Sequence, residues 1–261
     1  MRRIWAVAIN TYREAIRNKV LYALVFFAVA MILASVALAR LSLDDQLRVI
    51  HDLGLAAISL FSVIIAVFVG VNLVYKELER KTIYLILSKP IHRYEFILGR
   101  YLGTLATMGI LLLFMSLLFD ITIQLQGGHF RMVLVKALLL TYVEVAVVSA
   151  LALFFSSFSS PFLSGLFTML VFILGRLTPE IHELLTRLTP AWSRALDWAL
   201  AVIPDCHLFA ISGAVVQGKW VTIHGDFVTW LFVGQAAGYG LLYSGLVLAA
   251  ASFIFHRRDM S

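Results

Sequence analysis

Charged side chains are scarce in this chain. Of its 261 residues, 14% are charged and 61% are hydrophobic, and the mean hydropathy is +0.93. A soluble domain carries roughly 25% charged and about 45–50% apolar residues. So few polar groups cannot cover a water-soluble core of this size. The composition therefore indicates an integral membrane protein, with a single membrane domain over residues 1–261.

Cysteine is almost absent. The single residue Cys206 excludes an internal disulfide and any site built from several cysteines. It lies in Asp205-Cys206-His207, three potential metal ligands in a row, but adjacent side chains rarely all reach one ion. We therefore predict no metal site. No Ser/His/Asp arrangement is apparent either, so we do not expect an enzyme.

What the chain does have is long apolar runs. A helix needs about 20 apolar residues to cross the hydrocarbon of a bilayer. The runs do not alternate apolar and polar residues as the strands of a membrane barrel would. The pattern predicts an all-α polytopic protein with six spans. They are residues 20–39, 53–75, 101–125, 132–158, 162–175 and 228–255. The fifth, which begins just after Pro161, is the shortest.

Residues 1–19 are amphipathic rather than uniformly apolar. Their apolar side chains recur at helical spacing, with arginines mostly on the other side. The apolar run from 4 to 9 is too short for a cleaved signal peptide. We predict a helix that lies in the membrane interface.

Lysine and arginine set the predicted orientation. They are more frequent in the segments that share a side with the N-terminus, which predicts cytoplasmic N- and C-termini in a cell (inner) membrane. The net charge of +6 then faces anionic lipid, and no nucleic-acid partner is needed. Residues 176–227 form the long outer segment, for which we predict a helical cap with short helices at 179–188 and 192–203.

Several polar or small residues fall inside the spans. Glu144 is near the middle of the fourth span, where a carboxylate is costly and should face the bundle interior. It is either a substrate, ion or proton site or a hydrogen-bonded packing residue. Asp120 and Lys136 lie nearer the outer surface and can reach it. Gly234 and Gly238 in the last span permit close helix packing, within this subunit or with another.

The most polar stretch of the chain is residues 76–100, between the second and third spans. It mixes charges with aliphatic and aromatic residues, a composition that suits a protein contact. It contains Glu79-Arg-Lys-Thr-Ile83, followed by Leu85-Ile-Leu-Ser-Lys-Pro-Ile-His-Arg-Tyr-Glu-Phe-Ile-Leu-Gly-Arg100.

This stretch resembles the motif of type-2, exporter-type ABC-transporter permeases. In that family an acidic-Gly-Thr segment is followed by a leucine-rich stretch. Pro, an aliphatic residue, Ser-Arg, an acidic residue and Gly-Lys then follow in that order. The resemblance covers all six spans, the N-terminal helix and the cap, and the chain is similar to copper-processing and multidrug-type members. Three residues depart from this motif. Lys81 stands where Gly is usual, His92 where Ser or Thr is usual, and Arg100 where Lys is usual. His92 is a weaker N-cap for the following helix than Ser or Thr.

The resemblance implies that 76–100 is the coupling loop, which docks on a cytoplasmic ABC ATPase. The contact and turn residues would be Glu79, Arg80, Thr82, Pro90, Arg93 and Glu95. A phosphate-binding loop is missing from this chain, because Gly218-Lys219 is followed by Trp220. ATP and Mg²⁺ are therefore expected in the partner ATPase, and no cofactor in this chain.

The resemblance further implies an exporter with two permease subunits, identical or homologous, paired across spans two and five. The translocation path would then include Ser59, Ser62, Asn72, Glu144, Ser164 and Thr168. Two alternatives stay open. One is a proton-coupled secondary transporter that uses Glu144, although no inverted repeat is visible. The other is a non-transporting membrane scaffold or assembly protein.

Overall fold

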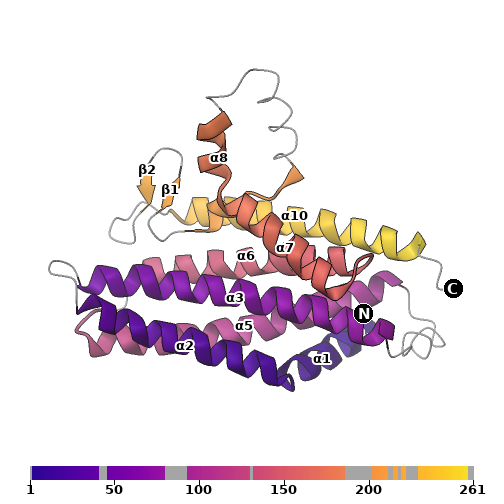
Figure 1. The fold of residues 1–261 in the computed structure, drawn as a ribbon, viewed down its shortest axis with the longest axis horizontal. Helices are drawn as coiled ribbons and strands as arrows, with labels where there is room; N and C mark the ends of the chain where they lie inside the picture. The colour runs from indigo at the N-terminus through magenta and orange to yellow at the C-terminus, as the bar shows by residue number, and fades with distance from the viewer. Residues whose placement is uncertain are drawn as a thin grey trace.

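The computed structural model describes residues 2–40, 46–79, 93–129, 132–185, 202–210, 214–216, 219–221 and 229–257. Five long helices lie side by side along the long axis of the molecule (Figure 1). They are α2 (Lys19–Ala39), α3 (Gln46–Glu79), α5 (Arg93–Leu125), α6 (Met132–Ser156) and α10 (Trp230–Arg257).

Each of these five helices contains a segment long and apolar enough to cross a bilayer, from 21 to 32 residues in length. Even the 21-residue segment is about 31 Å long, which matches a hydrocarbon core of about 30 Å. The predicted all-α polytopic fold is therefore confirmed.

The fifth predicted span is shorter than the others. It forms α7 (Pro161–Arg176), a 16-residue helix with proline in its first turn. At about 24 Å it does not cover the hydrocarbon by itself. Its last residue, Arg176, contacts Glu144, which is the middle residue of α6. The α7 helix thus ends deep inside the apolar layer.

The helix α6 is at the centre of the bundle. It packs against α3, α5, α7 and α10, and most of its residues are buried. By contrast, only one face of α2 is buried, through residues at helical spacing such as Leu21, Ala28 and Ile32, while Phe26 on its other face is exposed. An apolar surface of this kind is what a lipid-facing helix presents.

The predicted N-terminal helix is α1 (Arg2–Ile16), and it packs against the start of α5. Two glycines one turn apart on α5 permit the contact. A Cβ on Gly99 would lie 2.6 Å from Val7 Cβ, and one on Gly103 would lie 2.5 Å from the Ala8 carbonyl oxygen. Only glycine fits there without a shift of α1. The placement of α1 in a membrane interface stays a prediction.

The predicted coupling loop is bracketed by two helix ends. The α3 helix ends at Glu79 and α5 begins at Arg93, so Arg80, Thr82 and Pro90 lie outside the described residues. Glu95 is described and is buried in the first turn of α5. These helix ends lie at the same end of the bundle as α1 and the C-terminal end of α10 (Figure 1).

Among the described residues of the predicted outer cap, only some are helical. The helix α8 (Thr178–Leu185) corresponds to the first short helix expected there, and it turns away from the bundle axis (Figure 1). Most of the second expected helix, 192–203, lies outside the described residues. A short 3₁₀ helix, η1 (Cys206–Phe209), and an antiparallel hairpin follow, the hairpin being formed by β1 (Ala214–Val216) and β2 (Lys219–Val221). The sequence patterns did not predict this hairpin.

Candidate functional site: a buried ion pair joining three helices

Glu144 is completely buried on α6, and its carboxylate lies among helices rather than facing lipid. Two other helices supply its partners. Ser59, on α3, is buried as well, whereas the side chain of Arg176, the last residue of α7, is 26% exposed. The prediction that Glu144 faces the bundle interior is confirmed.

These three side chains form a closed triangle of hydrogen bonds. Arg176 Nη1 donates to Glu144 Oε1 at 2.6 Å and to Ser59 Oγ at 3.0 Å. Ser59 Oγ donates to Glu144 Oε2 at 2.9 Å. Both carboxylate oxygens are therefore satisfied, which is the condition under which a buried charge is tolerated in an apolar medium.

The guanidinium of Arg176 is positioned by the abrupt end of α7. Its carbon lies 5.8 Å from the centre of the Phe172 ring, one turn earlier, in a cation–π arrangement. The neighbouring Gly175 allows η1 to approach, because a Cβ there would overlap the Pro204 carbonyl oxygen and lie 3.2 Å from Cys206 Sγ. The returning chain thus closes directly over the ion pair.

The η1 segment is held by short-range hydrogen bonds. Asp205 Oδ1 accepts from the His207 amide at 3.2 Å, and the Asp205 amide donates to the Tyr239 hydroxyl oxygen at 3.0 Å. Burial raises the pKa of Asp205, with the His207 amide opposing the shift. Burial also raises the pKa of the Cys206 thiol, and the nearby Glu144 carboxylate adds to this shift.

Asp205, Cys206 and His207 have packing and hydrogen-bonding roles in the structure. Cys206 and the His207 side chain are buried, and the part of the chain that the structure describes contains no group of three His, Cys, Asp or Glu side chains able to hold an ion. These residues fix η1 against α7 and α10.

The remaining predicted translocation residues that are described are buried within one copy of the chain. Ser62 Oγ donates to Met115 Sδ at 3.9 Å, and Thr168 Oγ1 donates to the Ser164 carbonyl oxygen at 2.6 Å. The Ser164 hydroxyl is fully buried and has no hydrogen-bond partner among the described residues. The Asn72 side chain lies outside the described part of the chain. Among the described members of the predicted set, the structure joins Ser59 with Glu144 through their side chains and Thr168 with the backbone of Ser164, and the path itself stays a prediction.

Arg176 is the site residue that sequence reasoning missed. The sequence pattern places it at the start of the outer cap, 32 residues from Glu144. The signal that could have found it is the length of the fifth apolar run. Counted from Pro161, this run is too short to carry its terminal arginine to the outer surface, so the guanidinium needs a partner at depth.

The fold and the site together define a polytopic, helical membrane protein with a charged pair inside its bundle. The sequence from residue 5 to 260 matches the family described as ABC-2 family transporter protein, and the chain belongs to that family. It is therefore the permease component of an ABC transporter. No curated protein matches the chain significantly.

Proposed function

We propose that this permease couples ATP hydrolysis by a separate cytoplasmic ATPase to the outward movement of a substrate. The observation that carries the proposal is the match to the ABC-2 transporter family over nearly the whole chain. The charged stretch 76–100 is the proposed docking element for the ATPase, which would bring its own ATP and Mg²⁺.

The α3 helix offers a route from the docking element to the buried site. It is continuous from Gln46 to Glu79, and Ser59 lies on it about 30 Å from Glu79. A displacement at the loop would therefore move one corner of the Ser59–Glu144–Arg176 triangle. Because Glu144 and Arg176 belong to two other helices, the triangle is where that movement would pass to α6 and α7.

Two copies are proposed to pair so that the path lies between them. Exposed apolar side chains follow one stripe of α7, including Phe162, Leu166, Leu170 and Ile173. Such a stripe suits contact with a second copy as well as with lipid. A Cβ added at Gly234 or Gly238 of α10 would meet nothing within 4 Å, so among the described residues these glycines make no close helix contact inside one copy.

The proposal is tested by purifying the tagged chain from its native membrane in a mild detergent and identifying its partners by mass spectrometry. We expect an ATPase with a phosphate-binding loop. Exchanging two charges, Glu79→Arg with Arg80→Glu, should release it. The matched control exchanges Arg13→Glu with Glu14→Arg on α1, at the same end of the molecule and with the same net charge, and should retain it.

A proton-coupled transporter is the main rival, since Glu144 is an intramembrane carboxylate. Both of its oxygens are already engaged by Ser59 and Arg176. Three results together would show that the rival is correct: no ATPase co-purifies, a proton gradient alone drives transport, and Glu144→Gln abolishes that transport. ATP would then not be the energy source.

A further inference from the structure

The guanidinium of Arg176 has a donor edge that the ion pair does not use. Only Nη1 supplies the hydrogen bonds to Glu144 and Ser59. The Nε–H and the two N–H groups of Nη2 have no acceptor among the described residues, and neither nitrogen is among the buried side-chain atoms that lack a partner. Because 26% of the side chain is exposed, this edge of Arg176 is accessible.

The accessible edge lies too deep to be covered by lipid. Glu144 is the middle residue of α6, and Arg176 Nη1 lies 2.6 Å from its carboxylate. A charged donor at that depth faces protein or a water-filled cavity, because hydrocarbon offers no acceptor. The side of α7 that carries Arg176 therefore borders a polar space rather than lipid.

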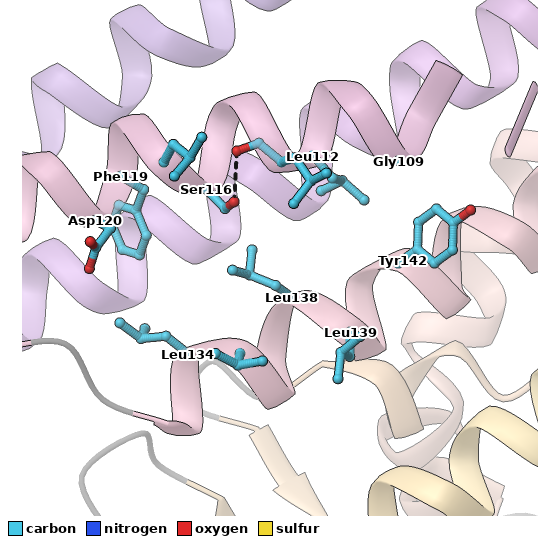
Figure 2. A pocket seen from close by; sticks show the side chains of 12 residues that line it. Gly109, Leu112, Ser116, Phe119, Asp120, Leu134, Leu138, Leu139 and Tyr142 are labelled. Atoms are coloured by element: carbon cyan, nitrogen blue, oxygen red, sulfur yellow. Dashed lines mark hydrogen bonds between the residues drawn. The ribbon is translucent and has the colours of Figure 1, made fainter. Parts of the chain in front are cut away.

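The hollow between α5 and α6 is of a different kind (Figure 2). Its volume is about 400 Å³, leucines dominate its lining, and no member of the Ser59–Glu144–Arg176 triangle lines it. The hydroxyls of Ser116 and Tyr142 in this hollow donate to backbone carbonyl oxygens at 2.8 and 3.2 Å. An apolar hollow of this kind suits lipid chains, and the polar space beside Arg176 lies on another side of the bundle.

The ion pair holds the guanidinium in one orientation. Two acceptors fix Nη1, and the Phe172 ring centre lies 5.8 Å from the guanidinium carbon. The remaining Nε–Nη2 edge carries two parallel N–H groups, the geometry that binds two oxygens of one carboxylate or phosphate group. Because Glu144 offsets the positive charge, recognition at this edge depends on geometry more than on net charge. The resulting weak retention suits a group that has to leave again.

We propose that the Nε–Nη2 edge of Arg176 is a substrate subsite that binds an oxyanion, such as a carboxylate, phosphate or sulfonate group of the transported molecule. Glu144 and Ser59 are positioning residues, which hold the guanidinium in place. This inference rests on the proposed transport function and adds the chemical class of the substrate to it. Lysine would not replace Arg176, because an ammonium group lacks the planar pair of donors.

The first experiment asks whether water reaches this side of α7. Cys206→Ala removes the only native thiol, and Ile173→Cys or Leu177→Cys then adds one beside Arg176, at positions that are 49% and 43% exposed. The variants are reconstituted into nanodiscs, which leave both faces of the membrane open. A membrane-impermeant methanethiosulfonate reagent, added with and without ATP, should modify both introduced cysteines.

Leu242→Cys is the matched control, because Leu242 is 73% exposed on α10 at a similar depth. A Cβ on Gly240 would lie 2.4 Å from Val143 Cγ1, and Val143 directly precedes Glu144. Leu242 is two residues further along α10, a rise of about 3 Å. A thiol that faces hydrocarbon there does not ionise, so the control should not react.

The second experiment measures preference for an oxyanion at Leu177→Cys. Two reagents of the same type are compared, one with a sulfonate and one with a trimethylammonium group, and their rate ratio is divided by the ratio for a small thiol in solution. The sulfonate should be favoured about tenfold, the effect of one charge-assisted hydrogen bond. Arg176→Lys keeps the charge without the planar donors, and Glu144→Gln with Arg176→Gln keeps the net charge of the pair. Both should lose the preference, while elution volume and thermal unfolding show that they are folded.

Three outcomes would overturn the proposal. The first is that Ile173→Cys and Leu177→Cys react no faster than Leu242→Cys, with or without ATP. The second is a rate ratio beside unmodified Arg176 that does not favour the sulfonate, and the third is a sulfonate preference that both Arg176 variants retain. The labelling itself needs no ATPase. Any of these outcomes in a preparation that hydrolyses ATP removes the oxyanion site alone, whereas a sulfonate preference without ATP hydrolysis contradicts only the proposed energy source.

Discussion

At the scale of single residues, the most costly feature of the molecule is the charge placed at the middle of α6. Glu144 is neutralised by Arg176 and hydrogen-bonded by Ser59, so neither charge is left alone in the apolar layer. Replacing such a pair with apolar residues is often tolerated, whereas removing one partner leaves an uncompensated charge. The contributions of Glu144 and Arg176 to the free energy of unfolding should therefore depend on each other, and this coupling energy can be measured.

A double-mutant cycle tests this coupling. Arg176→Met should destabilise the detergent-solubilised protein by about 3–5 kcal/mol, because it leaves the Glu144 carboxylate buried without a counter-charge. Glu144→Gln combined with Arg176→Met should cost clearly less than the sum of the two single changes. Thermal or denaturant unfolding provides the measurement. Additive single effects would show that the two residues do not interact.

Ser59→Ala provides a smaller, separate effect. It removes the donor to Glu144 Oε2 but leaves the ion pair, so we expect a loss of about 1–2 kcal/mol in the free energy of unfolding. In the Glu144→Gln background the loss should shrink, because a neutral amide needs the hydroxyl less. An unchanged loss would indicate that Ser59 matters only for packing.

Cys206 is the only cysteine of the chain and is fully buried beneath the end of α7. Because burial raises the pKa of its thiol, the fraction present as reactive thiolate at about pH 8 is lower than for an exposed cysteine. We expect maleimide labelling at that pH to be slow in the native protein and complete after denaturation. Gly175→Ala should accelerate it by separating α7 from η1. Rapid native labelling would contradict the packing of η1 over the ion pair.

At the scale of elements, the long helices follow from the apolar runs in the sequence, because a run of about 20 or more such residues has few alternatives in a bilayer. Their pairing does not follow in the same way. Which face of α6 meets α3 depends on side chains far apart in sequence. The short fifth run indicates that Arg176 needs a partner at depth, but the sequence does not identify Glu144 or Ser59 as that partner.

The outer segment was the least predictable element. Its apolar stretches are short, and short runs do not distinguish helix from strand. Residues 214–216 and 219–221 are rich in valine and flank Gln217-Gly218, which is a weak hairpin signal that the helical interpretation overrode. The end of α7 at Arg176 agrees with the predicted run 162–175, but sequence spacing does not reveal the close contact of Gly175 with the chain before η1.

The contact of α1 with α5 can be tested through glycine. Gly103→Val should destabilise the protein by about 1–3 kcal/mol, because the new side chain displaces Ala8 and Thr11 of α1. Gly245→Val, on α10, is the control, since nothing lies within 4 Å of a Cβ there. Thermal unfolding of both variants provides the measurement. Equal effects would show that α1 is not packed on α5.

At the scale of the whole molecule, the described helices leave large apolar surfaces uncovered. Most of the spanning windows of α2 and α10 are not buried within one copy, whereas 72% of the window in α3 and 67% of that in α6 are. Lipid and, in the proposed pairing, a second copy would cover these surfaces. The helices α3 and α6 are the most buried of the spanning helices, and the proposed coupling would act through them.

The central claim is that this permease transmits the energy of ATP hydrolysed by another chain. The most direct measurement is ATP hydrolysis by the tagged chain purified from its native membrane and reconstituted into lipid nanodiscs. We predict hydrolysis in the wild-type preparation and in the Arg13→Glu/Glu14→Arg control, and its loss in Glu79→Arg/Arg80→Glu. A wild-type preparation that contains this chain in its native membrane complexes but hydrolyses no ATP would contradict the account.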